Sequence, residues 1–248
     1  MSKIRLDLLL LERKMASTRT KAHELVVDGH VLVNGLVCRK PGEKFTEDAV
    51  IVLVKEEHPY VSRGGVKLAA ALAEFQISAA DKVVLDVGIS TGGFTDCLLR
   101  DGAKKVFGID VGVGQLAEKL KANPRLVLFE STHIKDFEPS KIGTPVDLLV
   151  ADLSFISLKK VIPFFKPFLG AGAELILLVK PQFELDQKSL GSGGIVRSVV
   201  DRGRALEGVQ HSLRENGYLV KGSMESPIAG GDGNVESFLH AVLGSLQG

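Results

Sequence analysis

The sequence is poor in features that mark secreted or metal-binding proteins. It has two cysteines in 248 residues, Cys38 and Cys97, which lie far apart on apolar stretches. They do not make a disulfide framework, so we expect both thiols to be buried and reduced, as in cytoplasmic proteins. The six histidines show no metal-ligand spacing, and we expect no metal site.

Long hydrophobic runs are also lacking. Near the N-terminus the continuous apolar run 8–11 is flanked by charges and is too short for the core of a signal peptide. The apolar region 161–179 contains Lys166, two prolines and Glu174, so it predicts helix, turn and buried strand instead of a membrane span. We therefore expect a cytoplasmic protein with no membrane partner.

A large excess of charge is missing as well, since the formal net charge of the chain is +1. Residues 1–22 nevertheless carry six basic side chains against two acidic ones. Positive charge clustered at one end of a near-neutral protein is typical of a surface that contacts nucleic-acid phosphates. On charge alone, an ordinary solvated helix face is the better explanation.

The first sixty residues predict a small α+β domain. Apolar spacing predicts helices over 3–14 and 18–28, with Ser17 as the N-cap of the second. An Asn-Gly turn predicts a hairpin over 30–37, and a further strand is expected over 48–54. The order of parts resembles the αL RNA-binding domain of a small-subunit ribosomal protein and of many pseudouridine synthases. That resemblance implies docking on structured RNA, with contacts from Arg5, Arg13, Arg19, Lys21 and Arg63.

We expect an RNA-binding domain at 1–57, a linker at 58–62 and a catalytic domain at 63–248. In the catalytic domain, apolar runs alternate with helical patterns such as 67–75. The expected strands cover 83–87, 105–110, 126–130, 147–152 and 174–180. Near-continuous apolar strands separated by helices predict a parallel sheet with helices on both faces, a Rossmann-like α/β fold.

A glycine-rich turn over 85–95 joins the first of these strands to a helix. Its pattern, with an acid at Asp86 and glycines at Gly88, Gly92 and Gly93, is not the G-x-G-x-x-G of dinucleotide binders. Glycine lets the backbone approach a ligand closely, and Asp86 would repel a pyrophosphate but attract an ammonium group. The turn favours S-adenosylmethionine, although a plain tight turn would have similar glycines.

Polar residues end four of the predicted strands, where ligands bind in such sheets: Asp86, Asp110, Asp152 and Lys180. Asp110 stands where an acid commonly binds a ribose diol, and adenine would then lie near 130–133. A partly desolvated lysine beside a second cation can take a proton from a hydroxyl. Lys180 is the candidate base and Lys67 the second cation, although two unrelated ion pairs explain the pattern equally well.

Five motifs then resemble the TlyA family of rRNA 2′-O-methyltransferases, whose catalytic domain is similar to the FtsJ type. They are RGGVKL from Arg63, DVGISTGGFTD from Asp86, ADLSFISL from Ala151, KPQFE from Lys180 and GGIVR from Gly193. The resemblance covers essentially the whole chain. It implies S-adenosylmethionine-dependent methylation of cytidine ribose in ribosomal RNA, with ribosomal RNA or ribosomal subunits as partner. The family also carries a haemolysin label, which nothing in the physics of this sequence supports.

The resemblance further implies particular site residues. A catalytic Lys-Asp-Lys-Glu tetrad would consist of Lys67, Asp152, Lys180 and Glu236. The cofactor-binding residues would be Asp86, Gly88, Ser90, Gly92, Gly93, Phe94, Asp110 and Glu130. Two departures stand out: Ile89 replaces a usual small residue and would crowd the methionine end of the cofactor, and Ser198 replaces a frequent acid.

Three other functions stay open: an RNA- or ribosome-binding factor without catalysis, a membrane-lytic protein and a dinucleotide oxidoreductase. The tetrad candidates argue against the first, and the lack of a basic amphipathic helix with an aromatic face argues against the second. Base-amine methylation is disfavoured, because residues 152–155 read DLSF instead of an Asn-Pro-Pro-aromatic motif. The glycine-rich segment 183–197 predicts either a loop that closes on RNA or a passive surface loop.

Overall fold

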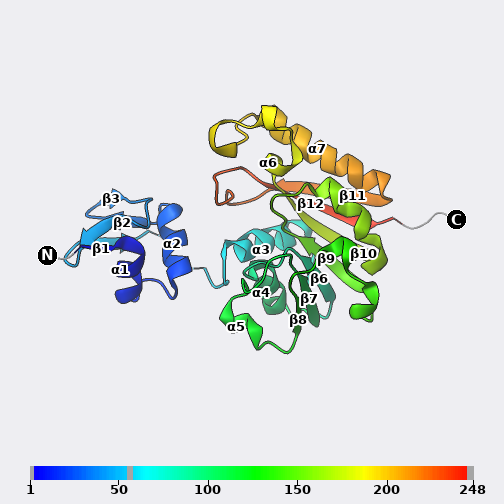
Figure 1. Cartoon of the computed structure of the whole chain (residues 1–248), viewed down its shortest axis with the longest axis horizontal. Coiled ribbons are helices and arrows are strands. Elements are labelled where there is room, and N and C mark those ends of the chain that lie inside the picture. The colour runs from blue at the N-terminus through cyan, green and yellow to red at the C-terminus, as the bar shows by residue number, and fades with distance from the viewer. Residues whose placement is uncertain (1–2, 55–57, 245–248) are drawn as a thin grey trace. The chain divides into compact units, whose positions relative to one another are not determined.

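The computed structural model describes residues 3–54 and 58–244. The chain divides into two compact units, Met1–Arg63 and Gly64–Gly248 (Figure 1). Within the described residues, no helix is both long enough and apolar enough to cross a membrane.

The first unit is a small α+β domain. Helices α1 (Leu6–Glu12) and α2 (Arg19–Val27) accompany a sheet with the order β3-β2-β5, formed by β2 (Val31–Val33), β3 (Leu36–Val37) and β5 (Ile51–Leu53). Asn34 and Gly35 adopt left-handed backbone angles, with φ of 51° and 82°, between β2 and β3. The predicted hairpin turn is therefore confirmed. The core of the unit includes Leu6, Leu10, Ala22, Val26 and Val31.

Two details predicted for this unit are wrong. The first helix begins only at Leu6, because β1 (Lys3–Arg5) pairs antiparallel with β4 (Lys44–Thr46). Thr18, and not Ser17, caps α2, since its hydroxyl accepts a hydrogen bond from Lys21 N at 3.2 Å. The strand depends on a partner some forty residues away, which helical periodicity within one segment does not reveal.

The second unit is built on a seven-stranded sheet with the order β11-β12-β10-β9-β6-β7-β8. The strands β6 (Val83–Val87), β7 (Lys105–Ile109), β8 (Leu126–Phe129), β9 (Val146–Ala151) and β10 (Leu169–Val179) run parallel, as predicted. Strands β11 (Tyr218–Glu225) and β12 (Ser237–Leu243) extend the sheet antiparallel. Strand β11 was not expected from the sequence. The strand order reverses between β6 and β9, so a ligand crevice is expected at their carboxyl ends.

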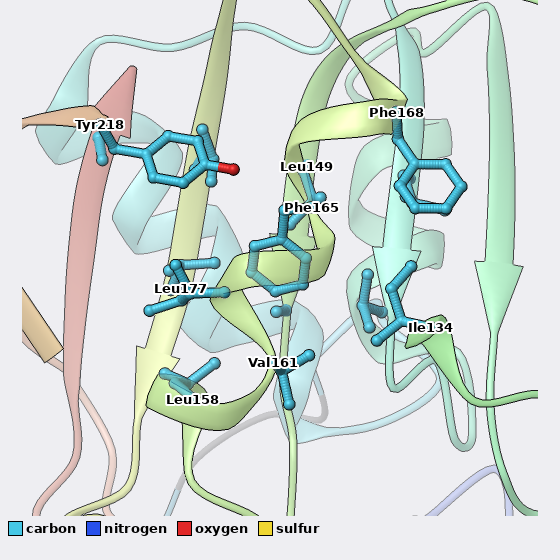
Figure 2. Close-up of a cluster of buried hydrophobic side chains, with 14 of the residues drawn as sticks. Ile134, Leu149, Leu158, Val161, Phe165, Phe168, Leu177 and Tyr218 are labelled. Atoms are coloured by element: carbon cyan, nitrogen blue, oxygen red, sulfur yellow. The ribbon is translucent and has the colours of Figure 1, made fainter. Parts of the chain in front are cut away.

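Helices flank this sheet, which confirms the predicted α/β fold (Figure 1). They are α3 (Arg63–Phe75), α4 (Gly93–Arg100), α5 (Glu118–Lys121), α6 (Pro181–Glu184) and α7 (Val199–Glu215). Helix α3 begins at Arg63 and not at Lys67, so Lys67 lies in its second turn. On one face of the sheet, side chains of α7 and of the short helical turns at 158–168 form the core shown in Figure 2.

Tyr218 is the one phenol in this core. It is buried, and its hydroxyl has no hydrogen-bond partner among the described residues. Burial raises the pKa of this phenol. Figure 2 shows the hydroxyl group pointing in among apolar side chains such as Leu177 and Leu149.

Tyr218→Phe is expected to raise the free energy of unfolding by about 1–2 kcal/mol, because it removes a buried polar group that has lost its hydration. Urea denaturation of the variant and the parent protein measures the change. A loss of stability of similar size would show that the hydroxyl does have a partner.

Candidate active site

The carboxyl ends of β6, β7 and β9 border a cavity of about 590 Å³. Three of the predicted cofactor residues line it, Gly88, Ser90 and Asp110, together with Asp152 and His133. The cavity lies at the point where the strand order reverses, and its volume suits a nucleoside-sized ligand.

Asp110 follows β7 and is held by two backbone groups. Its Oδ2 accepts a hydrogen bond from Ser90 N at 2.7 Å, and its Oδ1 accepts one from Gly112 N at 2.7 Å. An ionised carboxylate has about four lone-pair sites. Two therefore remain to accept hydrogen bonds from a pair of neighbouring hydroxyls such as a ribose diol.

Gly88 explains why the turn after β6 needs glycine. Its φ is +87°, and a Cβ at this position would lie 2.4 Å from the carbonyl oxygen of Asp152. The turn after β6 thus passes directly against the end of β9. This contact brings the turn after β6 and Asp152 together in one cavity wall.

The remaining predicted cofactor residues lie beside the cavity and not in its wall. Gly92 caps α4 with φ +89°, and Gly93 and Phe94 are buried in the first turn of that helix. Glu130 Oε1 accepts a hydrogen bond from Gly114 N at 2.6 Å, which ties down the loop after Asp110. These residues are placed to shape the turn and the loop.

Ile89, which was expected to crowd the cofactor, does not line the cavity. Its side chain is 4% exposed and packs over Gly108 of β7, where a Cβ would lie 2.4 Å from Ile89 Cδ1. A glycine inside a strand often marks the close approach of another group. Gly108 was the sequence signal that could have placed this isoleucine in the core.

Asp86 is fully buried at the end of β6, and its Oδ2 accepts a hydrogen bond from Thr95 Oγ1 at 2.7 Å. Burial raises the pKa of Asp86 to about 7, and the charges of Asp152 and Asp110 add to the rise. The folded protein therefore holds this proton more tightly than the unfolded chain does. The stability that depends on it is full below about pH 4 and is lost as the pH rises through 7.

Asp86→Asn keeps an acceptor for Thr95 and removes the titration. It is expected to raise the free energy of unfolding at pH 8 by on the order of a few kcal/mol, and by much less at pH 5. Urea denaturation at both pH values measures the difference. A gain that is equal at the two pH values would contradict the raised pKa of this carboxyl.

The four residues predicted as a catalytic tetrad come together as two ion pairs. Lys180 Nζ lies 2.5 Å from Asp152 Oδ1 and donates to Ser154 Oγ at 3.1 Å. Lys67 Nζ lies 2.5 Å from Glu236 Oε2, with both side chains less than 10% exposed. Burial raises the pKa of Glu236, while the positive charges of Lys67 and Lys180 oppose the rise. The two pairs therefore interact electrostatically.

A second cavity, of about 470 Å³, holds Lys180 and Glu236 in its wall and shares Ser154 and Phe155 with the first. Lys180 thus reaches a space next to the cofactor-sized cavity. Two cavities that share part of their walls, with a lysine in the second, suit a transfer from one bound molecule to another. Sequence reasoning did not single out Ser154 or Phe155, although both belong to a motif it quoted.

Asn234 fixes the glycine-rich loop against the turn that carries Glu236. It is fully buried; its Oδ1 accepts from Val196 N at 2.8 Å and its Nδ2 donates to Gly194 O at 3.1 Å. Ser198, the second departure from the family pattern, caps α7 by accepting from Asp201 N at 3.2 Å. A serine is therefore well suited to that position.

Two of the predicted RNA contacts lie on the surface of the first unit. Arg5 and Arg19 both bind the buried carboxylate of Asp7, at 2.8 and 3.3 Å, with side chains 40% and 61% exposed. The hydrogen bond from Arg5 lowers the pKa of Asp7 to about 2 against the effect of burial. Asp7 thus presents two guanidinium groups side by side.

The other three basic residues are engaged within the same unit. Arg13 donates to the carbonyls of Glu47 and Ala49. Lys21 is buried and donates to His58 O at 2.5 Å, and Arg63 binds Asp28 at 2.6 Å. Arg5 and Arg19 are thus the two of these residues that share one carboxylate partner and keep side chains 40% and 61% exposed. Among residues 3–54 and 58–244, no cluster of three or more His, Cys, Asp or Glu side chains could hold a metal ion.

Known protein families match both units of the chain. The FtsJ-like methyltransferase family model matches residues 60–242, and the S4 domain model matches residues 4–51. The 16S/23S rRNA (cytidine-2′-O)-methyltransferase TlyA of Mycobacterium tuberculosis is 42% identical over 95% of this chain and 88% of its own length. Hemolysin A of Brachyspira hyodysenteriae is 36% identical over 97% of this chain and all of its own length. A solved structure from Streptococcus thermophilus, described as a hemolysin, covers 99% of this chain and 90% of its own, at 39% identity and a TM-score of 0.78.

Proposed function

Since the chain belongs to the FtsJ-like methyltransferase family and carries an S4 domain ahead of it, we propose that it methylates the ribose 2′-hydroxyl of a cytidine in ribosomal RNA. One observation carries the proposal: Lys180, in the wall of the second cavity, is paired with Asp152, in the wall of the first. Relatives over 40% identical that are named as cytidine-2′-O-methyltransferases supply the substrate class.

S-adenosylmethionine is the methyl donor in this proposal, and it supplies an electrophilic methyl group on a sulfonium. Asp110 would accept hydrogen bonds from its ribose diol, since the carboxylate is already oriented by Ser90 N and Gly112 N. Gly88 lines the first cavity, so a ligand there would lie against the backbone at the end of β6. Asp86, behind the turn, contributes negative potential near the ammonium group whenever it is ionised.

Lys180 would hold the 2′-hydroxyl in the second cavity and accept its proton during methyl transfer. Asp152 and Ser154 orient the lysine. Lys67 and Glu236 balance charge and hold the ribose. Most of the acceleration would come from positioning the hydroxyl group for the transfer.

The first unit is proposed to dock on ribosomal RNA through its exposed guanidinium groups, with residues 1–57 as the RNA-binding domain and 63–248 as the catalytic one. Arg5→Ala and Arg19→Ala are each expected to weaken RNA binding and to lower the salt slope of log K by about 1. Fluorescence anisotropy against a salt series measures this. Lys104→Ala is the matched control, since it removes an exposed charge at the amino end of β7, away from both cavities. An unchanged salt slope in both arginine variants would contradict RNA docking at this surface.

The function itself is tested with radiolabelled S-adenosylmethionine and ribosomal subunits. Label is expected in RNA and, after digestion to nucleosides, in 2′-O-methylcytidine. Tight binding to subunits without transfer of label would favour a non-catalytic RNA-binding factor. Label on a base instead of a ribose would reject the role given to Lys180.

A further inference from the structure

The segment 152–158 follows β9 and lies at the rim of both cavities. One of its residues has an unfavourable backbone conformation. Phe155 adopts φ +64°, and its side chain is 91% exposed. A bulky residue in the left-handed region is energetically unfavourable and persists only where its surroundings impose it. The contacts that impose it lie on either side of Phe155.

Ser154 is held on one side and Ser157 and Leu158 on the other. Ser154 Oγ receives the hydrogen bond from Lys180 Nζ at 3.1 Å. Glu184 uses both carboxylate oxygens on the far side: Oε2 accepts from Ser157 Oγ at 2.5 Å, and Oε1 accepts from Leu158 N at 2.7 Å. The two anchors bracket the left-handed residue.

Both anchors come from one short element. Helix α6 is a single turn, with Lys180 as its N-cap and Glu184 as its last residue. Lys159 Nζ also donates to the backbone carbonyl of Glu184 at 2.9 Å. The position of the 152–158 segment relative to Lys180 is therefore set at two points by the same turn.

Burying a carboxylate is costly unless its oxygens are hydrogen-bonded. The Glu184 side chain is 1% exposed, and burial raises the pKa of this carboxyl against the two hydrogen bonds that it accepts. A neutral or apolar side chain would fill the same place at lower cost if packing were its sole purpose. The two accepted hydrogen bonds give a reason for an acid here, since they define where the segment runs.

We propose that Glu184 is a positioning residue for methyl transfer. Acting through Ser157 and Leu158, it holds Ser154 against Lys180 and keeps Phe155 at the rim shared by the two cavities. The effect on rate rests on the proposed function, whereas the restraint on the segment is a property of the chain alone. The two parts are therefore tested separately.

The restraint is tested on the full chain without substrate. Glu184→Ala and the milder Ser157→Ala are expected to speed hydrogen exchange at the amide of Leu158. Asp101→Ala is the matched control, because Asp101 also binds one backbone amide and one serine, Ala79 N at 2.5 Å and Ser78 Oγ at 3.2 Å. Unchanged exchange at Leu158 in both test variants would overturn the proposal whether or not the protein is an enzyme.

The effect on transfer is tested with ribosomal subunits. Glu184→Ala is expected to lower kcat by about 10- to 100-fold, as a misplaced group does, and Glu184→Gln to recover most of the loss because its amide oxygen still accepts from Leu158 N. If Glu184 acts through Ser154, combining Glu184→Ala with Ser154→Ala costs clearly less than the product of the two single losses. Fully multiplicative losses, or wild-type kcat in Glu184→Ala, would overturn the proposal. A parent protein that labels no RNA would instead reject the proposed function and leave the exchange result standing.

Discussion

Lys180→Met is expected to lower the rate of methyl transfer by about 10³-fold, within the range that removal of a general base produces. Methionine keeps much of the volume of the side chain but can neither accept the hydroxyl proton nor bind Asp152. Lys180 lies outside the wall of the 590 Å³ cavity, so the affinity for S-adenosylmethionine should change by less than about threefold, well under the 1.4 kcal/mol that a tenfold change represents. Single-turnover transfer and calorimetric titration of the cofactor measure the two quantities.

The chain offers a matched control for this variant. Lys82 Nζ pairs with Glu174 Oε2 at 2.7 Å on the same sheet, beside the amino end of β6. Lys82→Met removes a lysine–carboxylate pair of the same kind away from both cavities, and it should leave the transfer rate near that of the parent protein. Equal losses in the two variants would indicate a general effect of breaking an ion pair, and full activity of Lys180→Met would remove Lys180 from the role of base.

Much of the site was accessible from sequence because it is built from strand ends. Asp86, Asp110, Asp152 and Lys180 each follow a predicted apolar run, and parallel strands bring their carboxyl ends to one edge. The glycine pattern of the turn also predicted a close backbone approach, and at Gly88 the turn does approach the backbone of Asp152. Local pattern and topology therefore lead to the same residues.

The features that the sequence did not predict depend on contacts between distant parts of the chain. Lys21 looked like an exposed basic residue but is buried against the carbonyl of His58. Ile89 was expected to crowd the cofactor, but its side chain packs over Gly108 on the neighbouring strand β7. Strand β11 alternates partly buried and exposed residues after the buried Tyr218, and it pairs with β12. Neither short-range periodicity nor residue type reports which partner a side chain will meet after folding.

The Lys67–Glu236 pair is expected to affect the stability of the fold as well as the site. Both side chains are less than 10% exposed, and the charged atoms lie 2.5 Å apart. Removing one member of a buried pair leaves the other without compensation, at a typical cost of about 3–5 kcal/mol. Lys67→Met is therefore expected to lower the free energy of unfolding by about that amount, as measured by urea denaturation at pH 8.

The pH dependence of this loss follows from the remaining carboxyl. Burial already raises the pKa of Glu236, and the attraction of Lys67 is the largest opposing effect. Without Lys67 the folded state binds the Glu236 proton still more tightly than the unfolded chain does, so stability falls further as the pH rises. The loss of unfolding free energy in Lys67→Met should be smaller at pH 5 than at pH 8.

The double variant Lys67→Met/Glu236→Gln, which buries no charge at this pair, should recover most of the stability at pH 8 but not the transfer of methyl groups. A deficit that is independent of pH, or a double variant as unstable as Lys67→Met, would show that packing and not the charge of Glu236 causes the loss.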